Sequence, residues 1–322
     1  MTGITLRLPS GIGGQVALSY APRGDITALL AAVPVERVPA LVRALFAVCA
    51  NAQGHAADLA VEAALGVEAA PDALAEREIH TWTEVVREHG LRVGLDWARL
   101  LGEAPDTARA RAFVALSTAA DPSALIEDAV TGLPPGRWLT ITCASELARW
   151  AGTGCTVAAR FIASLFHVST LTPADGEPGP LAARHADHPL LARGLPAGSL
   201  IACHVARLID LCRAPVRLAA LRGGDAVPVR GVAAGPGSGR AEVPCARGTL
   251  LHEVSVVAGR VARYRVLSPT DGAFAPGGRA ERQFQRLSAW PPDDRVRLAE
   301  VMMQALDPCV DYAILDQTVE VA

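Results

Sequence analysis

The chain has 322 residues, of which 51% are hydrophobic, and its formal net charge is −3. This length and apolar content are enough to bury one large core or two smaller ones. All 30 basic residues are arginines, and the net negative charge argues against a nucleic-acid-binding protein, because phosphate binding favours a basic face.

The first two thirds of the chain are predicted to be mostly helical. Residues 4–20 alternate between apolar and polar side chains and predict a short β-hairpin that turns near residues 10–14. Residues 172–189 are rich in Pro, Gly, Asp and His, so we expect an exposed loop there. Apolar residues at helical spacing, with breaks at prolines and glycines, predict helices over 35–66, 71–89, 121–131, 143–167 and 197–213.

The helix predicted over residues 35–66 has a direct bearing on Cys49. Apolar residues precede this cysteine at helical spacing, which places its thiol on the apolar face. Gly66 is the predicted end of the helix. We therefore expect the thiol of Cys49 to be buried.

The last third of the chain is predicted to contain a β-hairpin and a final helix. Residues 231–240 are rich in glycine and are expected to form a mobile break. Residues 249–257 and 260–267 are rich in valine, leucine and tyrosine, and the Ala-Gly pair between them is typical of a two-residue hairpin loop. A helix is expected over residues 292–306.

The register of this hairpin follows from its turn. If Val257 pairs with Arg260, each outward step moves one residue on both strands. Arg247 then lies opposite Thr270, at the open end of the hairpin. The sequence therefore predicts that these two side chains lie close together.

The most specific motif lies near the carboxyl end. Residues 306–315 read Leu-Asp-Pro-Cys-Val-Asp-Tyr-Ala-Ile-Leu. This segment resembles the D-P-C-x-x-C-x-x-H ending of nickel–iron hydrogenase large subunits, with Cys309 kept. Tyr312 stands in place of the second cysteine and Leu315 in place of the histidine. A chain that keeps half of this metal-binding motif is not expected to be the enzyme.

A second segment resembles the amino-terminal C-x-x-C-x-x-x-H motif of the same family and the helix that follows it. Aligned without gaps, Cys49 falls on the second cysteine. Phe46 then takes the place of the first cysteine, and Gln53 takes the place of the histidine.

Two further segments are similar to this family. Residues 242–252 resemble E-x-P-R-G-x-L-x-H, with Arg247 on the arginine and one extra residue before it. Pro269 and Thr270 match the beginning of the P-T-T-W-N-x-S-P-R-D segment, whose remainder is largely lost.

The resemblance implies an α+β, mainly α protein with a reduced nickel–iron hydrogenase large-subunit-like fold: a helical core with small peripheral β-hairpins. Cys49 and Cys309 must meet, so we expect residues 1–322 to form a single domain.

No positively charged leader or long apolar segment indicates export or a membrane span. Seven cysteines without a disulfide-framework spacing favour a reducing compartment. We therefore expect a cytoplasmic protein without membrane contact.

In the enzymes of this family, four thiolates hold nickel and iron, and the iron carries two cyanides and one carbonyl. The resemblance implies that Cys49 and Cys309 are metal ligands of such an Fe(CN)2CO unit, because thiolates suit iron. Two thiolates do not complete a nickel site of this type, so no nickel is expected.

The cyanides of such a unit are buried acceptors that need hydrogen-bond donors. The resemblance implies that Arg247, Pro269 and Thr270 meet them. Arginine suits this role because it is always charged and rich in donors. Gln53 is expected to point towards the metal.

Alternative interpretations stay open for several of these residues. Cys245, two residues before Arg247, is either a third candidate thiol or a packing residue. Arg247 itself is alternatively a surface charge. His55 is either a helix-surface histidine or a metal candidate that ranks below Gln53, from which it points about 200° away. His252 is expected to satisfy a local hydrogen bond. The remaining cysteines, which are expected only to pack, are Cys143, Cys155, Cys203 and Cys212.

These features together predict an accessory protein of nickel–iron hydrogenase maturation, similar to the HupK/HoxV proteins. It is expected to hold the iron unit transiently, after delivery by maturation chaperones, and to pass it to the hydrogenase large-subunit precursor. One alternative is a cofactor-free interaction chaperone of the maturation complex. A divergent redox enzyme is less favoured, because Gly13 stands where the family places a proton-relay glutamate.

Overall fold

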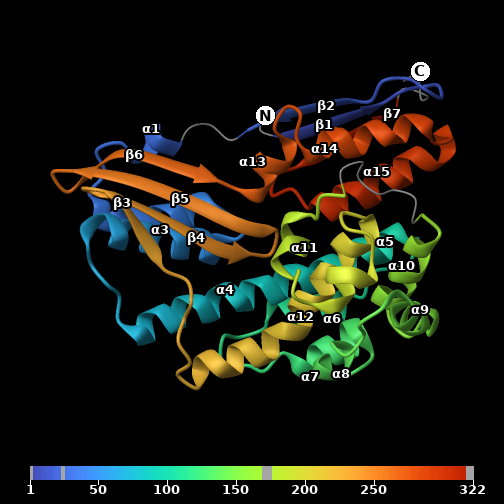
Figure 1. The fold of residues 1–322 in the computed structure, drawn as a ribbon, viewed down its shortest axis with the longest axis horizontal. Coiled ribbons are helices and arrows are strands. Elements are labelled where there is room, and N and C mark those ends of the chain that lie inside the picture. Colours follow the sequence, from blue (N-terminus) through green and yellow to red (C-terminus); the bar gives the residue numbers. More distant parts are fainter. Residues whose placement is uncertain (1–2, 23–25, 169–175, 317–322) are drawn as a thin grey trace.

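In the computed structural model, which describes residues 3–22, 26–168 and 176–316, α-helices pack against two separate β-sheets (Figure 1). One sheet has the strand order β2-β1-β7 and the other has the order β3-β4-β5-β6. The strands are β1 (Gly3–Leu8), β2 (Ala17–Ala21), β3 (Gly231–Gly235), β4 (Ser238–Cys245), β5 (Gly248–Val257), β6 (Arg260–Leu267) and β7 (Tyr312–Asp316).

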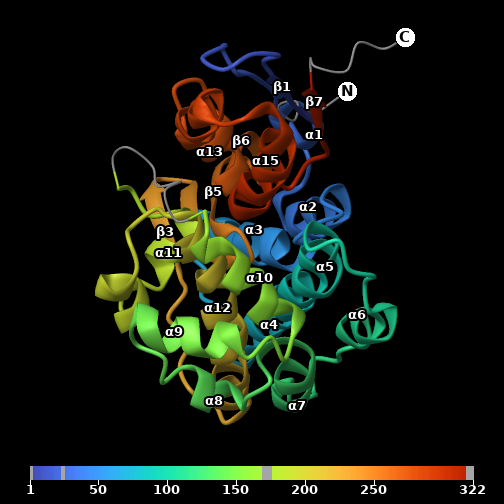
Figure 2. The same cartoon turned by 90° about the vertical axis from the view of Figure 1, so that its right-hand side faces the viewer.

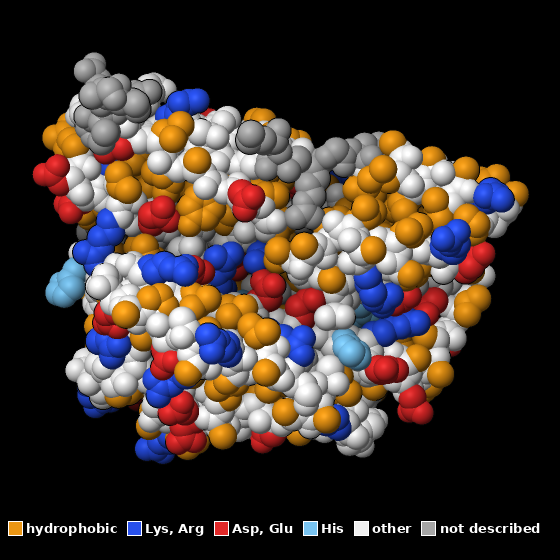
Figure 3. Space-filling model, turned by 180° about the vertical axis from the view of Figure 1, so that it is seen from behind, with side chains coloured by type: hydrophobic (Ala, Val, Ile, Leu, Met, Phe, Trp, Pro, Cys, Tyr) orange, Lys and Arg blue, Asp and Glu red, His pale blue; other side chains and the backbone are white. Residues whose placement is uncertain are grey.

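The helices form the larger part of the molecule. Figure 2 shows the three-stranded sheet and α15 at one end and α7 and α8 at the other. The helices are α1 (Ile26–Leu30), α2 (Val38–Leu45), α3 (Ala50–Leu65), α4 (Pro71–Leu91), α5 (Ala98–Leu100), α6 (Thr107–Val114), α7 (Ser123–Ile126), α8 (Pro135–Trp138), α9 (Ala144–Gly152), α10 (Val157–Phe166), α11 (Pro180–Arg184), α12 (Leu200–Arg222), α13 (Pro269–Phe274), α14 (Arg279–Phe284) and α15 (Pro292–Leu306). Among the described residues, no helix combines the length and apolar character of a membrane span. On the face shown in Figure 3, basic and acidic side chains are mixed with hydrophobic ones.

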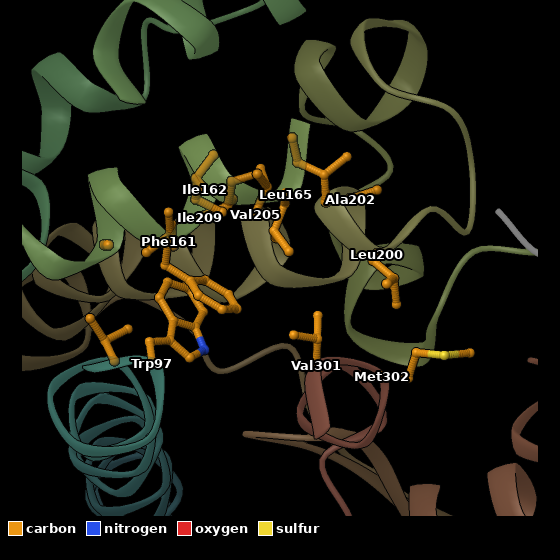
Figure 4. Close-up of a cluster of buried hydrophobic side chains, with 14 of the residues drawn as sticks. Trp97, Phe161, Ile162, Leu165, Leu200, Ala202, Val205, Ile209, Val301 and Met302 are labelled. Atoms are coloured by element: carbon orange, nitrogen blue, oxygen red, sulfur yellow. The ribbon is translucent and has the colours of Figure 1, made fainter. Parts of the chain in front are cut away.

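The larger hydrophobic core holds α10, α12 and α15 together (Figure 4). Trp97, at the end of a π-helical turn that follows α4, stacks on Phe161 of α10 with ring centroids 4.5 Å apart. Val301 and Met302 bring α15 into the same core. The predicted final helix over residues 292–306 is confirmed, and this packing fixes the helix that precedes Cys309.

The three-stranded sheet joins opposite ends of the chain. The predicted amino-terminal hairpin is confirmed as β1 and β2. Strand β7 then pairs in parallel with β1, with Ile4 opposite Tyr312. Such a pairing has no local sequence signal, because its partners lie almost a whole chain apart. The pairing of β7 with β1 fixes the position of the segment that follows Cys309.

The prediction of a mobile break over residues 231–240 is wrong, because β3 and β4 lie there. The glycines permit close packing of α3 on the sheet. A Cβ atom on Gly239 would lie 2.0 Å from the carbonyl oxygen of Ala60, and one on Gly231 would lie 2.1 Å from that of Leu59. Glycine in these strands therefore marks a close approach of two backbones.

The hairpin of β5 and β6 is confirmed, but its predicted register is off by one. Its turn at residues 258–259 has two residues with positive φ, as a two-residue turn of this kind requires. A bulge near residues 255–256 shifts the pairing, so Leu267 lies opposite Leu251 and not Leu250. The ladder ends there, and α13 begins shortly afterwards.

The predicted continuous helix over residues 35–66 is also wrong. Helix α2 ends at Leu45, and α3 begins at Ala50 after a link in which Cys49 adopts φ 55°. Apolar spacing continues through this link, which is why the sequence suggested one helix. The predicted end at Gly66 is confirmed, with φ 67°.

The other predicted helices differ from the structure mainly at their ends and interruptions. The predicted helix over 71–89 corresponds to α4, and the one over 121–131 to α7 and a π-helical turn. The predicted helix over 143–167 is interrupted between α9 and α10, and the one from 197 extends through Arg222 as α12.

The exposed loop predicted over residues 172–189 is only partly correct. Residues 172–175 lie outside the described residues. Residues 180–184 form α11, and His185 and His188 are buried. The polar composition of this segment therefore reflects buried contacts as well as solvent exposure.

Candidate metal-unit site

The Asp-Pro-Cys segment forms the turn between α15 and β7. Asp307 ends α15 in the left-handed conformation, with φ 47°. The backbone N–H of Cys309 donates to Oγ1 of Thr270 at 3.1 Å, and the Thr270 hydroxyl donates to Sγ of Cys309 at 3.3 Å. Thr270 and Cys309 are therefore in direct contact, at the start of α13.

The thiol of Cys49 lies at the beginning of α3. The backbone N–H groups of Asn51 and Ala52, in the first turn of α3, donate to the Glu84 carboxylate at 2.8 and 3.1 Å. Cys49 is buried, as predicted, although it lies in a link and not within a helix. Burial raises the pKa of Cys49, and the Arg247 guanidinium opposes this.

Cys245 lies in the same apolar cluster as Cys49. The members of this cluster include Ala52 and Leu250. Burial raises the pKa of Cys245 to about 11. The structure therefore brings the third candidate thiol next to the first.

Arg247 lies in the two-residue turn that joins β4 to β5. Arg184 of α11 donates to the carbonyl oxygens on both sides of this turn, those of Cys245 at 2.7 Å and Gly248 at 2.9 Å. Arg247 is only 6% exposed, so the alternative of a surface charge is wrong. Gly248 in turn lies against the ring of Pro269, since a Cβ atom on this glycine would lie 3.2 Å from it.

The guanidinium of Arg247 is held by two carboxylates. It lies 2.8 Å from Glu88 and 3.6 Å from Asp307. Burial acts to lower the pKa of Arg247, but these carboxylates raise it on balance. Its Nε and one terminal nitrogen are buried without a hydrogen-bond partner. The site therefore contains unused cationic donors.

Asp307 is a site residue to which the sequence reasoning gave no role, although it belongs to the recognised motif. Besides Arg247, it pairs with Arg92 at 2.8 Å and Arg207 at 3.1 Å. Burial acts to raise the pKa of Asp307, but the three arginines hold it well below its usual range. Asp307 thus ties the Cys309 turn to the guanidinium of Arg247.

Gln53 lies one turn after Cys49 and points towards the four-stranded sheet. Its side-chain oxygen lies 2.8 Å from Nε2 of His252, whose Nδ1 lies 2.8 Å from the Tyr264 hydroxyl. The local hydrogen-bonding role predicted for His252 is confirmed. His55 is buried against Thr81 of α4 and points away from Gln53, so the alternative of a helix-surface histidine is wrong.

A pocket of about 430 Å³ opens beside these residues. Its lining includes Phe46, Gln53 and Cys309, together with Tyr20 and Asp271. Phe46 therefore fills part of the wall where the resemblance places another cysteine.

The candidate site thus has two adjoining parts. Gln53 and Cys309 line the pocket and Thr270 contacts Cys309, whereas Cys49, Cys245 and Arg247 are buried and do not line it. Burial is the main cause that raises the pKa of Cys49, and a charge on Cys309 adds to it. Within the part of the chain that the structure describes, no three His, Cys, Asp or Glu side chains are already arranged to hold a metal ion.

The two other positions where the motif has changed lie on β7. The Tyr312 hydroxyl donates to Glu300 at 2.8 Å and accepts from Gln304 at 3.2 Å, both on α15. Leu315 lies opposite Arg7 of β1 and is 40% exposed. Tyr312 therefore joins β7 to α15, whereas Leu315 is an exposed residue of the strand.

Sequence comparison finds relatives that match nearly the full chain, whereas no protein-family model matches it. The hydrogenase expression/formation protein HoxV of Cupriavidus necator is 30% identical over 89% of this chain and 89% of its own length. HupK of Rhodobacter capsulatus is 31% identical over 97% of this chain and 96% of its own. HupV of Azotobacter chroococcum is 28% identical over 97% of both.

Comparison with solved structures identifies the fold. An NAD+-reducing nickel–iron hydrogenase superposes with a TM-score of 0.63, at 16% identity, over 92% of this chain and 93% of that one. A nickel–iron–selenium hydrogenase of Desulfovibrio vulgaris Hildenborough gives a TM-score of 0.59, at 14% identity, over 92% of both chains. The predicted α+β, mainly α fold of a nickel–iron hydrogenase large subunit is confirmed.

Proposed function

The chain belongs to the family of hydrogenase expression/formation proteins that includes HoxV and HupK, and on this premise we propose that it carries an Fe(CN)2CO unit during nickel–iron hydrogenase maturation. Cys49 and Cys309 are the proposed iron ligands, and Arg247 and Thr270 are the proposed contacts of the cyanides. The cargo is transient, and the protein is not itself the catalyst.

The observation that carries this proposal is the state of Arg247. Two of its nitrogens are buried without a hydrogen-bond partner, and charges on Cys49 and Cys245 act on this guanidinium. A buried donor without a partner costs about 1–3 kcal/mol. A cyanide nitrogen that enters this space supplies an acceptor, and the negative charge of the unit complements the guanidinium.

The number of thiolates also suits a carrier. The iron unit brings three diatomic ligands of its own, so a few sulfur donors are enough to hold it. A site with fewer thiolates than the family's complete metal site also releases its cargo more readily.

The proposed donor is a maturation chaperone, and the proposed recipient is the precursor of the hydrogenase large subunit. The large-subunit fold of the carrier supports this, because a chaperone that recognises the precursor would meet a similar shape here. The proposal places the exchange in the cytoplasm, where the seven free cysteines would stay reduced.

The test is infrared spectroscopy of the chain, purified without oxygen after co-expression with the hydrogenase maturation proteins. The proposal expects cyanide and carbonyl stretching bands together with bound iron. Cys49→Ser and Cys309→Ser are expected to lose both. Cys212→Ser is the matched control, because this buried thiol on α12 packs in a different core.

The same preparations separate the two alternatives. A cofactor-free interaction chaperone would lack the bands and would support maturation equally well with both cysteines replaced. A divergent redox enzyme would evolve or take up hydrogen as a purified chain. Either result would overturn the carrier proposal.

A further inference from the structure

We propose that Cys245 is a third sulfur ligand of the iron unit and forms a fixed pair with Cys49. This inference rests on the proposed carrier function and extends it to a third thiol, which lies two residues before Arg247. The juxtaposition of the two thiols across the α3–sheet interface is its starting point.

The two sulfurs come from different elements that are each fixed in place. Cys49 directly precedes α3, and the Glu84 carboxylate accepts two backbone N–H groups from the first turn of this helix. Cys245 ends β4 and pairs with Gly248 across the turn. Because both backbones are held, the positions of the two thiols do not depend on a bound metal.

Arg184 adds a second restraint on Cys245. Its guanidinium donates to the carbonyl oxygens of Cys245 and Gly248, and it also bonds the buried carboxylate of Asp210. Asp210 further accepts hydrogen bonds from His89 and His185. The turn that carries the thiol is therefore anchored to α4, α11 and α12.

The charge around the pair favours thiolates once a metal is present. Arg247 acts on both thiols and lowers the pKa of each against the effect of burial. Two of its nitrogens are buried without a hydrogen-bond partner. The guanidinium would thus neutralise part of the negative charge that two thiolates and two cyanides bring together.

The number of sulfurs matches the open positions on the iron. An octahedral iron with three diatomic ligands has three positions left, which Cys49, Cys245 and Cys309 would fill. The three sulfurs are not yet a closed cluster within the described residues. Cys49 and Cys245 therefore form the preset pair, and Cys309, at the pocket, completes the site when the unit enters.

Binding requires no change of oxidation state. Each thiol loses its proton to solvent as its sulfur bonds to iron, and the ligands that leave are those through which the delivering chaperone held the unit. No electron is transferred, so no oxidant or reductant is needed.

The test counts sulfur ligands by X-ray absorption spectroscopy at the iron edge. The wild-type chain, loaded by co-expression with the maturation proteins, is compared with Cys245→Ser, Cys245→Ala and Cys212→Ser. We expect both Cys245 variants to lose one sulfur neighbour, to shift the cyanide and carbonyl bands, and to retain iron roughly tenfold more weakly. Cys212→Ser is expected to match the wild type.

Thermal unfolding of each unloaded variant separates folding from ligation. The alanine variant removes the sulfur without burying a hydroxyl, so it keeps the test informative if the serine variant folds poorly. Wild-type bands with an unchanged sulfur count in Cys245→Ala would overturn the role of Cys245 and leave the carrier function intact. Absence of the bands from the wild type would overturn both.

Discussion

Replacement of Asp307 by asparagine tests whether the arginine cluster around the Asp-Pro-Cys turn depends on one carboxylate. Asparagine keeps the size of the side chain but removes the charge. The change leaves Arg207 and Arg247, which are only 2% and 6% exposed, without their shared anion. Arg92 keeps Asp96 as a second partner at 2.9 Å.

The magnitude follows from the loss of one partner in a buried ion cluster, which costs about 3–5 kcal/mol. For 322 residues, an unfolding entropy of about 2.1 cal/mol/K per residue gives about 0.7 kcal/mol/K. Asp307→Asn is therefore expected to lower Tm by roughly 4–7 °C. Asp128→Asn is the control, because this residue is largely exposed and pairs with Arg109 at the surface, where a pair contributes about 0–1 kcal/mol.

The pH dependence of this difference gives a second measurement. The pKa of Asp307 is lowered in the folded state, so its stabilising effect is complete above the pKa of an unfolded aspartate, about 4. The effect is lost as the pH falls further. Calorimetric scans from pH 8 to pH 3 should show the wild type and Asp307→Asn converging below about pH 4. Equal Tm values for Asp307→Asn and Asp128→Asn at pH 7 would refute the reasoning.

Three further predictions concern packing, the thiol contact and acid stability. Gly239→Ala places a Cβ atom 2.0 Å from a carbonyl oxygen of α3, so this variant should have a much lower Tm than Gly136→Ala, whose added Cβ atom meets nothing within 4 Å. Equal Tm values for the two variants would contradict this. Thr270→Val removes both hydrogen bonds to Cys309 and should reduce iron loading, whereas Thr270→Ser should retain it, as measured by iron per chain. Burial lowers the pKa of His252 to about 3, so the folded state disfavours the protonated imidazole. The free energy of unfolding, measured by urea titration, should therefore fall as the pH drops from about 6.5, by up to about 1.4 kcal/mol per pH unit for this residue. A flat pH profile would contradict this prediction.

The elements that the sequence predicted correctly are those with a local cause. Gly66 ends α3 because glycine adopts the left-handed conformation easily. The turn at residues 258–259 likewise needs two residues with positive φ. The contact between Thr270 and Cys309 joins two of the recognised motif segments.

The elements that were missed depend on distant partners. The pairing of β7 with β1, and the packing of Gly239 on Ala60, are decided by surfaces far apart in the sequence. The interruption before α3 was hidden because apolar residues keep a helical spacing through a link that is not helical. A hydrophobic pattern reports burial more directly than it reports backbone conformation.

Within the candidate site, the motif segments supplied the thiols and Arg247 but not the residues that hold them. Glu84, Glu88 and Asp210 lie outside those segments and are recognised only through their contacts. Cys245 lies within such a segment, but only the fold shows that it packs beside Cys49. Sequence patterns therefore identify ligands more readily than the side chains that orient them.

The parallel pairing of β7 with β1 also sets a time at which the site can first exist. Cys309 lies between α15 and β7, and both are translated long after β1. At about 5–20 residues per second, the ribosome makes β7 roughly 15–60 s after β1. A nascent chain therefore lacks the pocket until β7 has been made and has paired with β1, and the proposed cargo can be received only after that pairing.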